Sequence, residues 1–237
     1  MKKQNRKSVL TFLVNTAIIL IIACVGFVGF YGGKAISITG DEYSAIYNGD
    51  RSSDKVALMF NVYERTDNVK KIMEILKSRN ATATFFVGGC WADDNTETLN
   101  EMVNGGFEIA NHGYFHKDHK KLNLEKNKEE ILLTEKIVEA LCGYKTRLFA
   151  PPSGSFNVTT LKASAELGYK VIMWSKDTID WRDSDEKLII KRATNGVGGG
   201  DLILMHPKDV TVAVLGRILD VLSQSGLKPS TVTQTIS

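Results

Sequence analysis

Short apolar runs alternate with longer charged segments over most of this 237-residue chain, and this alternation constrains the fold more than any other feature. The apolar runs have the length of buried strands. Between them, apolar residues recur three and four positions apart, as in a helix that buries one face. The expected strands are 56–60, 81–87, 107–110, 147–150, 169–174 and 202–205. The expected helices are 69–77 (with Thr66 or Asp67 as N-cap), 97–103, 126–141, 158–167, 185–193 and 210–223.

This order of elements predicts an α/β fold in which parallel strands are covered by helices. About six or seven such units favour a (β/α) barrel of about seven parallel strands over a small open sheet. In barrels of this kind the loops that follow the carboxyl ends of the strands carry the chemistry. We therefore expect functional residues directly after the apolar runs.

The amino-terminal part of the chain has the pattern of a membrane anchor. Residues 9–31 are almost wholly apolar, and about 20 such residues cross a bilayer core. The basic residues of segment 1–8 should remain in the cytoplasm. We expect a single transmembrane helix at 9–31, a spacer at 32–54 and a domain at 55–237 outside the cell membrane. The alternative is a cleaved signal peptide and a secreted domain, although the apolar region of a signal peptide is usually only ~7–15 residues long.

Charge and cysteine content limit the classes of function. The formal net charge is +3, and four basic residues precede the apolar segment, so the remainder of the chain is close to neutral. A nucleic-acid partner is therefore not expected, because such proteins present a basic face. Cys24 lies inside the apolar segment. Cys90 and Cys142 could form a disulfide or remain two free thiols, and the sequence leaves both open.

Histidines stand out among the candidate site residues. His112 directly follows an expected strand, and His116 comes four positions later. On a helical turn this spacing places two imidazoles on one face, where they can share a metal ion. His206 follows the last expected strand, at 202–205. Other polar residues also follow strands, namely Asn61, the turn Pro151-Pro152-Ser153, and Asp177 and Asp180-Trp181.

Taken in order, these motifs resemble the polysaccharide deacetylase family. The matching elements are His-x-x-x-His, Pro-Pro-x-Gly, Asp-x-x-Asp-Trp and Leu-x-x-His, and they lie within residues 55–230. The resemblance implies a distorted barrel that removes acetyl groups from N-acetylated polysaccharides such as peptidoglycan. It also implies a divalent metal, zinc or similar, which activates water and polarises the amide carbonyl.

The resemblance implies roles for individual residues. His112 and His116 would be metal ligands, and His206 would be the general acid. Asp180, in preference to Asp177, would orient His206 and raise its proton affinity. The substrate pocket would be formed by Trp181, Pro151, Pro152 and Ser153.

The chain departs from the family pattern where its first motif, Thr-Phe-Asp-Asp-Gly, aligns with residues 59–63. Asn61 stands at the position of the general base, and Val62 at that of the third metal ligand. An amide cannot accept a proton near neutral pH, and an isopropyl group cannot bind a metal. Ala150 replaces the Arg that supports the base, and Ser153 replaces an aromatic residue. General-base catalysis alone typically increases the rate of a reaction by ~10²–10⁴-fold.

Two side chains could compensate for these losses, and two functions follow. Glu64 could act as base or ligand, and His119 would share a helical face with the other two histidines.

The first hypothesis is a metal-dependent N-deacetylase of cell-wall or related glycans, a hydrolase of carbon–nitrogen bonds with an altered site. The second is a catalytically inactive, glycan-binding member of the same fold. We rank the enzyme first on the sequence, and a purely structural anchor last.

Overall fold

The computed structural model describes residues 43–237. The expected tail (1–8), anchor (9–31) and first part of the spacer (32–42), together with Cys24, lie outside the described residues. No helix within residues 43–237 is both long enough and apolar enough to cross a membrane.

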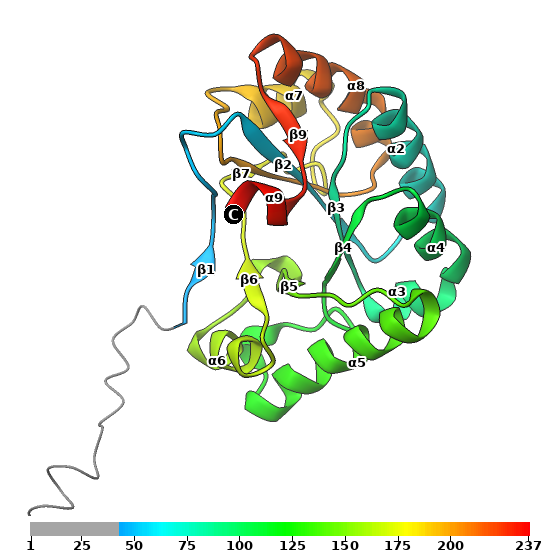
Figure 1. Ribbon diagram of the computed structural model, residues 1–237, viewed down its shortest axis with the longest axis vertical. Helices are drawn as coiled ribbons and strands as arrows, with labels where there is room; N and C mark the ends of the chain where they lie inside the picture. Colours follow the sequence, from blue (N-terminus) through cyan, green and yellow to red (C-terminus); the bar gives the residue numbers. More distant parts are fainter. Residues whose placement is uncertain (1–42) are drawn as a thin grey trace, which may run out of the picture. The chain divides into compact units, whose positions relative to one another are not determined.

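A curved parallel sheet forms the centre of the domain (Figure 1), which confirms the expected α/β class. Eight strands follow the order β1-β6-β5-β4-β3-β2-β8-β7, and β9 pairs with the beginning of β2. All of these pairings are parallel. The arrangement fits a distorted barrel. The strands are β1 (Ala45–Ile46), β2 (Lys55–Val62), β3 (Thr84–Val87), β4 (Glu108–Asn111), β5 (Leu148–Phe149), β6 (Lys170–Ile172), β7 (Lys176–Asp177), β8 (Leu202–Met205) and β9 (Lys228–Ser230).

Helices surround the sheet on its outer side (Figure 1). They are α2 (Thr66–Ser78), α3 (Gly89–Asp94), α4 (Thr96–Asn104), α5 (Leu124–Cys142), α6 (Val158–Glu166), α7 (Glu186–Thr194) and α8 (Asp209–Gln224). Short 3-10 turns occur at His119–Lys121 and Pro152–Gly154. The last helix, α9 (Val232–Ile236), lies against the interior of the sheet instead.

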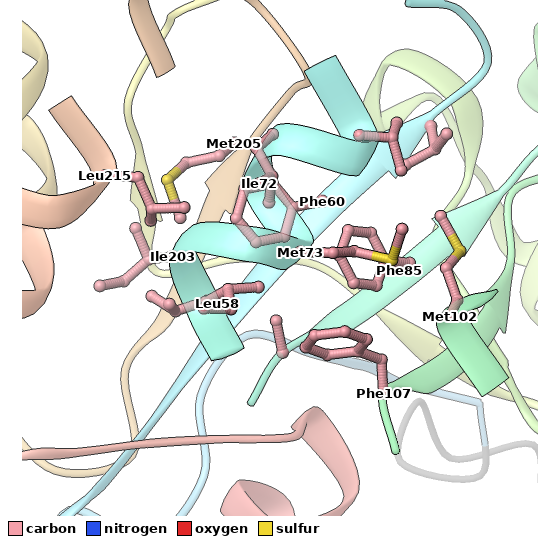
Figure 2. Close-up of a cluster of buried hydrophobic side chains, with 14 of the residues drawn as sticks. Leu58, Phe60, Ile72, Met73, Phe85, Met102, Phe107, Ile203, Met205 and Leu215 are labelled. Atoms are coloured by element: carbon pink, nitrogen blue, oxygen red, sulfur yellow. The ribbon is translucent and has the colours of Figure 1, made fainter. Parts of the chain in front are cut away.

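Alternation along β2 separates two hydrophobic layers, because successive side chains of a strand point to opposite faces. Leu58, Phe60 and Val62 belong to the outer layer between the sheet and the helices. Figure 2 shows this layer, in which Phe60 lies beside Ile72 of α2, and Phe85 and Phe107 lie nearby. Ala57 and Met59 point inward. Asn61 is the next inward position, at the carboxyl end of the strand.

The interior of the barrel is filled at the end opposite to the strand tips. Val232 and Ile236 of α9 pack against the inward residues, and the backbone N–H of Val232 donates to Thr84 Oγ1 over 2.8 Å. Thr231 and Gln234 form a capping box that begins α9. The other end, where the carboxyl ends of the strands meet, is left for polar side chains.

Part of the expected spacer, residues 43–54, pairs with strands of the domain. Their strand β1 pairs with β6, and Asn48 bridges to Asp201. Arg51 forms an ion pair with Asp201 over 2.6 Å. The sequence places the boundary at residue 55 because the first long apolar run begins there. Strand β1 has only two residues, which is too short to show an alternation of apolar and polar side chains.

Other boundaries also differ from the expectations. Helix α2 begins at Thr66, and its N-cap residue is Arg65 in a left-handed conformation with φ 60°. Helix α3 and strand β7 were not expected from periodicity. Cys90 and Cys142 are both free thiols in the described part of the chain.

Candidate functional site

A pocket of about 300 Å³ lies at the carboxyl ends of the strands. Its walls come from residues in or after β2, β4, β5, β6, β7 and β8, as expected for this type of fold. The lining residues are Asn61, Tyr63, His112, His116, Ser153, Trp174, Asp177, Trp181, Leu204 and His206. The structure therefore brings together three of the four histidines in the chain.

His112 follows β4 and is held in one tautomer. Its Nδ1 atom lies 2.7 Å from the carbonyl oxygen of Ala150. Since a carbonyl only accepts hydrogen bonds, Nδ1 carries the proton and Nε2 keeps a free lone pair. Burial, followed by the proximity of His116, lowers the pKa of His112 well below its usual value. The imidazole is therefore neutral near pH 7.

His116 reaches the pocket through a loop and not through the helical turn that the spacing predicted. Gly113 and His116 both have left-handed backbones, with φ 75° and φ 53°. The ring centroids of His112 and His116 nevertheless lie 5.1 Å apart. Burial also lowers the pKa of His116. Two mostly neutral imidazoles thus stand side by side in the pocket.

His206 follows β8 and is oriented by Asp180. Its Nδ1 atom lies 2.8 Å from Asp180 Oδ1, and its backbone N–H donates to Oδ2 over 2.7 Å. The hydroxyl of Thr211 donates to the same Oδ2. The carboxylate is buried and fully occupied by these partners. This arrangement fixes the orientation of the imidazole. Asp177 instead lines the pocket and accepts from the backbone N–H of Ile179.

Asn61 and Val62 lie on opposite faces of β2. The Asn61 side chain lines the pocket and is only 3% exposed. Its Oδ1 atom has no hydrogen-bond partner among residues 43–237. Val62 is fully buried in the outer hydrophobic layer. The position aligned with the third metal ligand therefore points away from the histidines.

Tyr63 is a pocket residue that sequence reasoning missed. Its ring lies 4.1 Å from that of His116 and 6.2 Å from that of His112, centroid to centroid. It stands where the family motif has glycine, and a large aromatic side chain at that position was the available signal. Trp174 and Leu204 also line the pocket without having been expected.

The structure does not bring His119 or Glu64 into the pocket. His119 is buried, with Nδ1 2.8 Å from Asn127 Oδ1 and its ring against Phe149. It is separated from the pocket because the chain from 112 to 119 is not a continuous helix. Glu64 forms an ion pair with Lys208. Neither side chain is among the described residues that line the pocket, so the structure does not place either suggested compensation beside His112 and His116.

The expected substrate-pocket residues divide into two groups. Trp181 is half-exposed and forms part of the wall, and Ser153 lines the pocket beside it. Pro151 and Pro152 are buried and are not among the described residues that line the cavity. They act through the turn that presents Ser153, whose φ is 55°.

The donor set does not fit a catalytic zinc site. Such sites usually have three protein ligands and an open position. The spacing of His112 and His116 suits a shared ion, but no group of three or more His, Cys, Asp or Glu side chains with metal-binding geometry occurs within residues 43–237. With Val62 in the hydrophobic layer, the third donor is lost by orientation as well as by chemistry.

Comparisons with known proteins place these observations in a family. A family model described as polysaccharide deacetylase matches residues 48–172. The uncharacterized protein YlxY of Bacillus subtilis is 33% identical, over 80% of this chain and 59% of its own length. A peptidoglycan-N-acetylglucosamine deacetylase of Bacillus cereus is 30% identical, over 70% of this chain and 60% of its own length. The chain thus spans about 60% of these curated relatives.

Solved structures show the same fold. A CE4 family pseudoenzyme from Bacillus anthracis is 31% identical, with a TM-score of 0.79, covering 82% of this chain and 69% of that one. A mutant of it is described as having restored enzymatic activity. The Bc1960 peptidoglycan N-acetylglucosamine deacetylase is 28% identical, also with a TM-score of 0.79, over 83% of this chain and 94% of that one.

Proposed function

This chain belongs to the polysaccharide deacetylase family, and from that premise we propose that its pocket binds N-acetylated glycans of the peptidoglycan type without hydrolysing them. The observation that carries the proposal is the pair of neighbours Asn61 and Val62. The first places an amide where the family has its base, and the second leaves the two histidines without a ligand at the position aligned with the third one.

The remaining groups support binding better than turnover. His206, held by Asp180, can donate a proton to a leaving amine. Position 61 has no carboxylate that could take a proton from water, so His206 has no partner at the position where the family has its base. Hydrolysis needs both steps, whereas recognition needs only shape and hydrogen bonds.

The lining of the pocket has the composition of a small-molecule site. Trp174, Trp181 and Leu204 supply apolar walls, and Asn61 and His206 supply a few convergent polar groups. Pockets of about 300 Å³ with this composition are typical ligand sites. Half-exposed aromatic rings such as Trp181 can stack on the apolar faces of sugar rings.

A second candidate function is slow de-N-acetylation. It is supported by the three hydrogen bonds that hold Asp180 in place beside His206, an arrangement suited to proton transfer. The sequence alone ranked this enzyme first. The orientation of Val62 and the positions of His119 and Glu64 reverse that order.

One experiment separates the two candidates. The full chain is titrated with the N-acetylglucosamine tetramer, with and without EDTA, and acetate release is measured in parallel. We expect saturable binding that EDTA does not change, and no acetate above the level of a His206→Ala variant. Acetate release that requires added zinc and disappears in His206→Ala would establish the enzyme instead.

We further propose that the domain acts outside the cell membrane, anchored through residues 9–31 with the amino terminus inside. The proposal rests on the basic and apolar pattern of the first residues. Without protease, the full chain should be found in the membrane fraction. Protease added to intact cells should digest the domain. Recovery of the domain in the medium would support the secreted alternative.

A further inference from the structure

The side-chain amide of Asn61 is the least explained polar group in the pocket. Its Oδ1 atom is buried, and no described residue donates a hydrogen bond to it. Buried polar groups in folded proteins are nearly always paired, and each exception asks for a reason. The inward register of β2 holds this amide at the carboxyl end of the strand, where its side chain lines the pocket.

Two of the neighbouring histidines already use one ring nitrogen on a protein partner. His112 uses its Nδ1 proton on Ala150, and His206 directs Nδ1 to Asp180. Tyr63 packs its ring against His116. Asn61 is therefore free to meet a ligand with both a donor and an acceptor.

An acetamido group is the chemical complement of this amide. It carries one N–H donor and one carbonyl acceptor, which match Oδ1 and Nδ2 of Asn61. Its methyl group is apolar, and Leu204 and Trp174 provide apolar surface in the same pocket. A carboxylate at position 61 could form only the acceptor half of this pair.

We propose that Asn61 is a specificity-determining residue that recognises the acetamido group of the bound sugar by paired amide hydrogen bonds. The proposal rests on the proposed glycan-binding function, and it assigns recognition of the acetyl group to the side-chain amide of Asn61. It predicts that the pocket distinguishes acetylated sugars from the same sugars with free amines. A free ammonium has three donors and no acceptor, so it can donate to Oδ1 but leaves Nδ2 without an acceptor.

The test compares two oligosaccharides that differ only in acetylation, the tetramers of N-acetylglucosamine and of glucosamine. Affinity for each is measured by calorimetry at pH 7.5 with the full chain. We expect the wild type to favour the acetylated tetramer by about tenfold or more. Asn61→Leu keeps the volume but removes both hydrogen bonds, and should lose this preference. Its melting temperature should not fall, because Asn61 has no protein partner at Oδ1.

A second variant is expected to change the preference between the two tetramers in a defined direction. Asn61→Asp keeps the shape but offers only acceptors and a negative charge, so the preference should shift toward the glucosamine tetramer. Asn104→Leu, an exposed position at the end of α4, serves as control and should retain the wild-type ratio.

The failures are distinguishable. If Asn61→Leu and Asn61→Asp keep the wild-type ratio while the acetylated tetramer still binds, the role of Asn61 is overturned and the glycan-binding function stands. If the wild type binds neither tetramer, both proposals are overturned.

Discussion

Asn61 and Val62 are neighbours in the chain, but their side chains meet different surroundings. Asn61 lines the pocket, whereas Val62 is packed among apolar side chains behind the sheet. Restoring a carboxylate at each position therefore has different consequences. At 61 the charge would face the pocket, and at 62 it would enter a hydrophobic layer.

Val62→Asp should destabilise the domain by about 3 kcal/mol or more, because an unpaired carboxylate would be buried. Val62→Thr keeps the shape without the charge and should cost only about 1–2 kcal/mol. Urea unfolding at pH 7.5 measures both. A Val62→Asp protein that keeps wild-type stability and binds one zinc ion per chain would contradict the orientation described for this side chain.

Buried histidines should make the domain sensitive to acid. Burial lowers the pKa of both His112 and His119 below 6.5, although the hydrogen bond to Asn127 partly opposes this for His119. In the unfolded chain both groups gain protons below about pH 6.5, while in the folded chain they remain neutral. The stability they provide is present above pH 6.5 and is lost as the pH falls, at up to about 1.4 kcal/mol per pH unit for each.

The measurement compares free energies of unfolding at pH 7.5 and pH 5.5. The wild type should be less stable at pH 5.5. In His119→Gln, which cannot titrate, the difference between the two pH values should shrink. An unchanged difference would mean that the pKa of His119 is the same in the folded and the unfolded chain.

At the scale of elements, long periodic segments could be predicted and short ones could not. Strand β8 was expected at its observed bounds, and α5 and α8 within a few residues of theirs. β1 and β7 contain only two residues each, too few to show alternation. Their pairing is decided by the strands beside them, which is information that a local pattern lacks.

In the candidate site, too, some residues could be predicted from the sequence and others could not. The strand-end rule identified His112, His206 and Asn61, because it depends only on where strands stop. It could not decide which way Val62 points, since that requires the exact end of β2. It misplaced His119 because left-handed residues at 113 and 116 interrupt the helical spacing.

Gly113 should be essential to the loop that joins the two pocket histidines. Its φ is 75°, and an added Cβ would lie 3.1 Å from His119 Nε2. Gly113→Ala should therefore cost about 2 kcal/mol or more, through backbone strain and a close contact. Gly226 is a matched control, because its φ is 71° but no described atom lies within 4 Å of an added Cβ. Gly226→Ala should cost about 1 kcal/mol in the same unfolding assay, and equal losses would argue against the His119 contact.

At the scale of the whole molecule, the segment before β2 completes the domain. β1 pairs with β6, and Arg51 neutralises Asp201, whose side chain is buried. Burial alone would raise the pKa of Asp201, but hydrogen bonds from Ser175, Gly198 and Arg51 leave it lowered. The carboxylate is therefore charged and depends on partners from both sides.

A chain that begins at residue 55 should be less stable than one that begins at residue 43, by about 2–4 kcal/mol. The shorter chain loses the β1–β6 pairing and leaves Asp201 without Arg51. Arg51→Ala in the longer chain isolates the ion pair, and should cost about 1 kcal/mol because Arg51 is half-exposed. Chemical denaturation of the three proteins measures these differences, and equal stabilities would show that the segment is dispensable.

Helix α9 fills the interior of the barrel at the end opposite to the pocket. A polymer cannot be threaded through a barrel that is filled in this way. If the pocket binds glycans as proposed, a long strand would lie across the rim with one sugar in the pocket, and the strand would have to dissociate and rebind before the next sugar could enter.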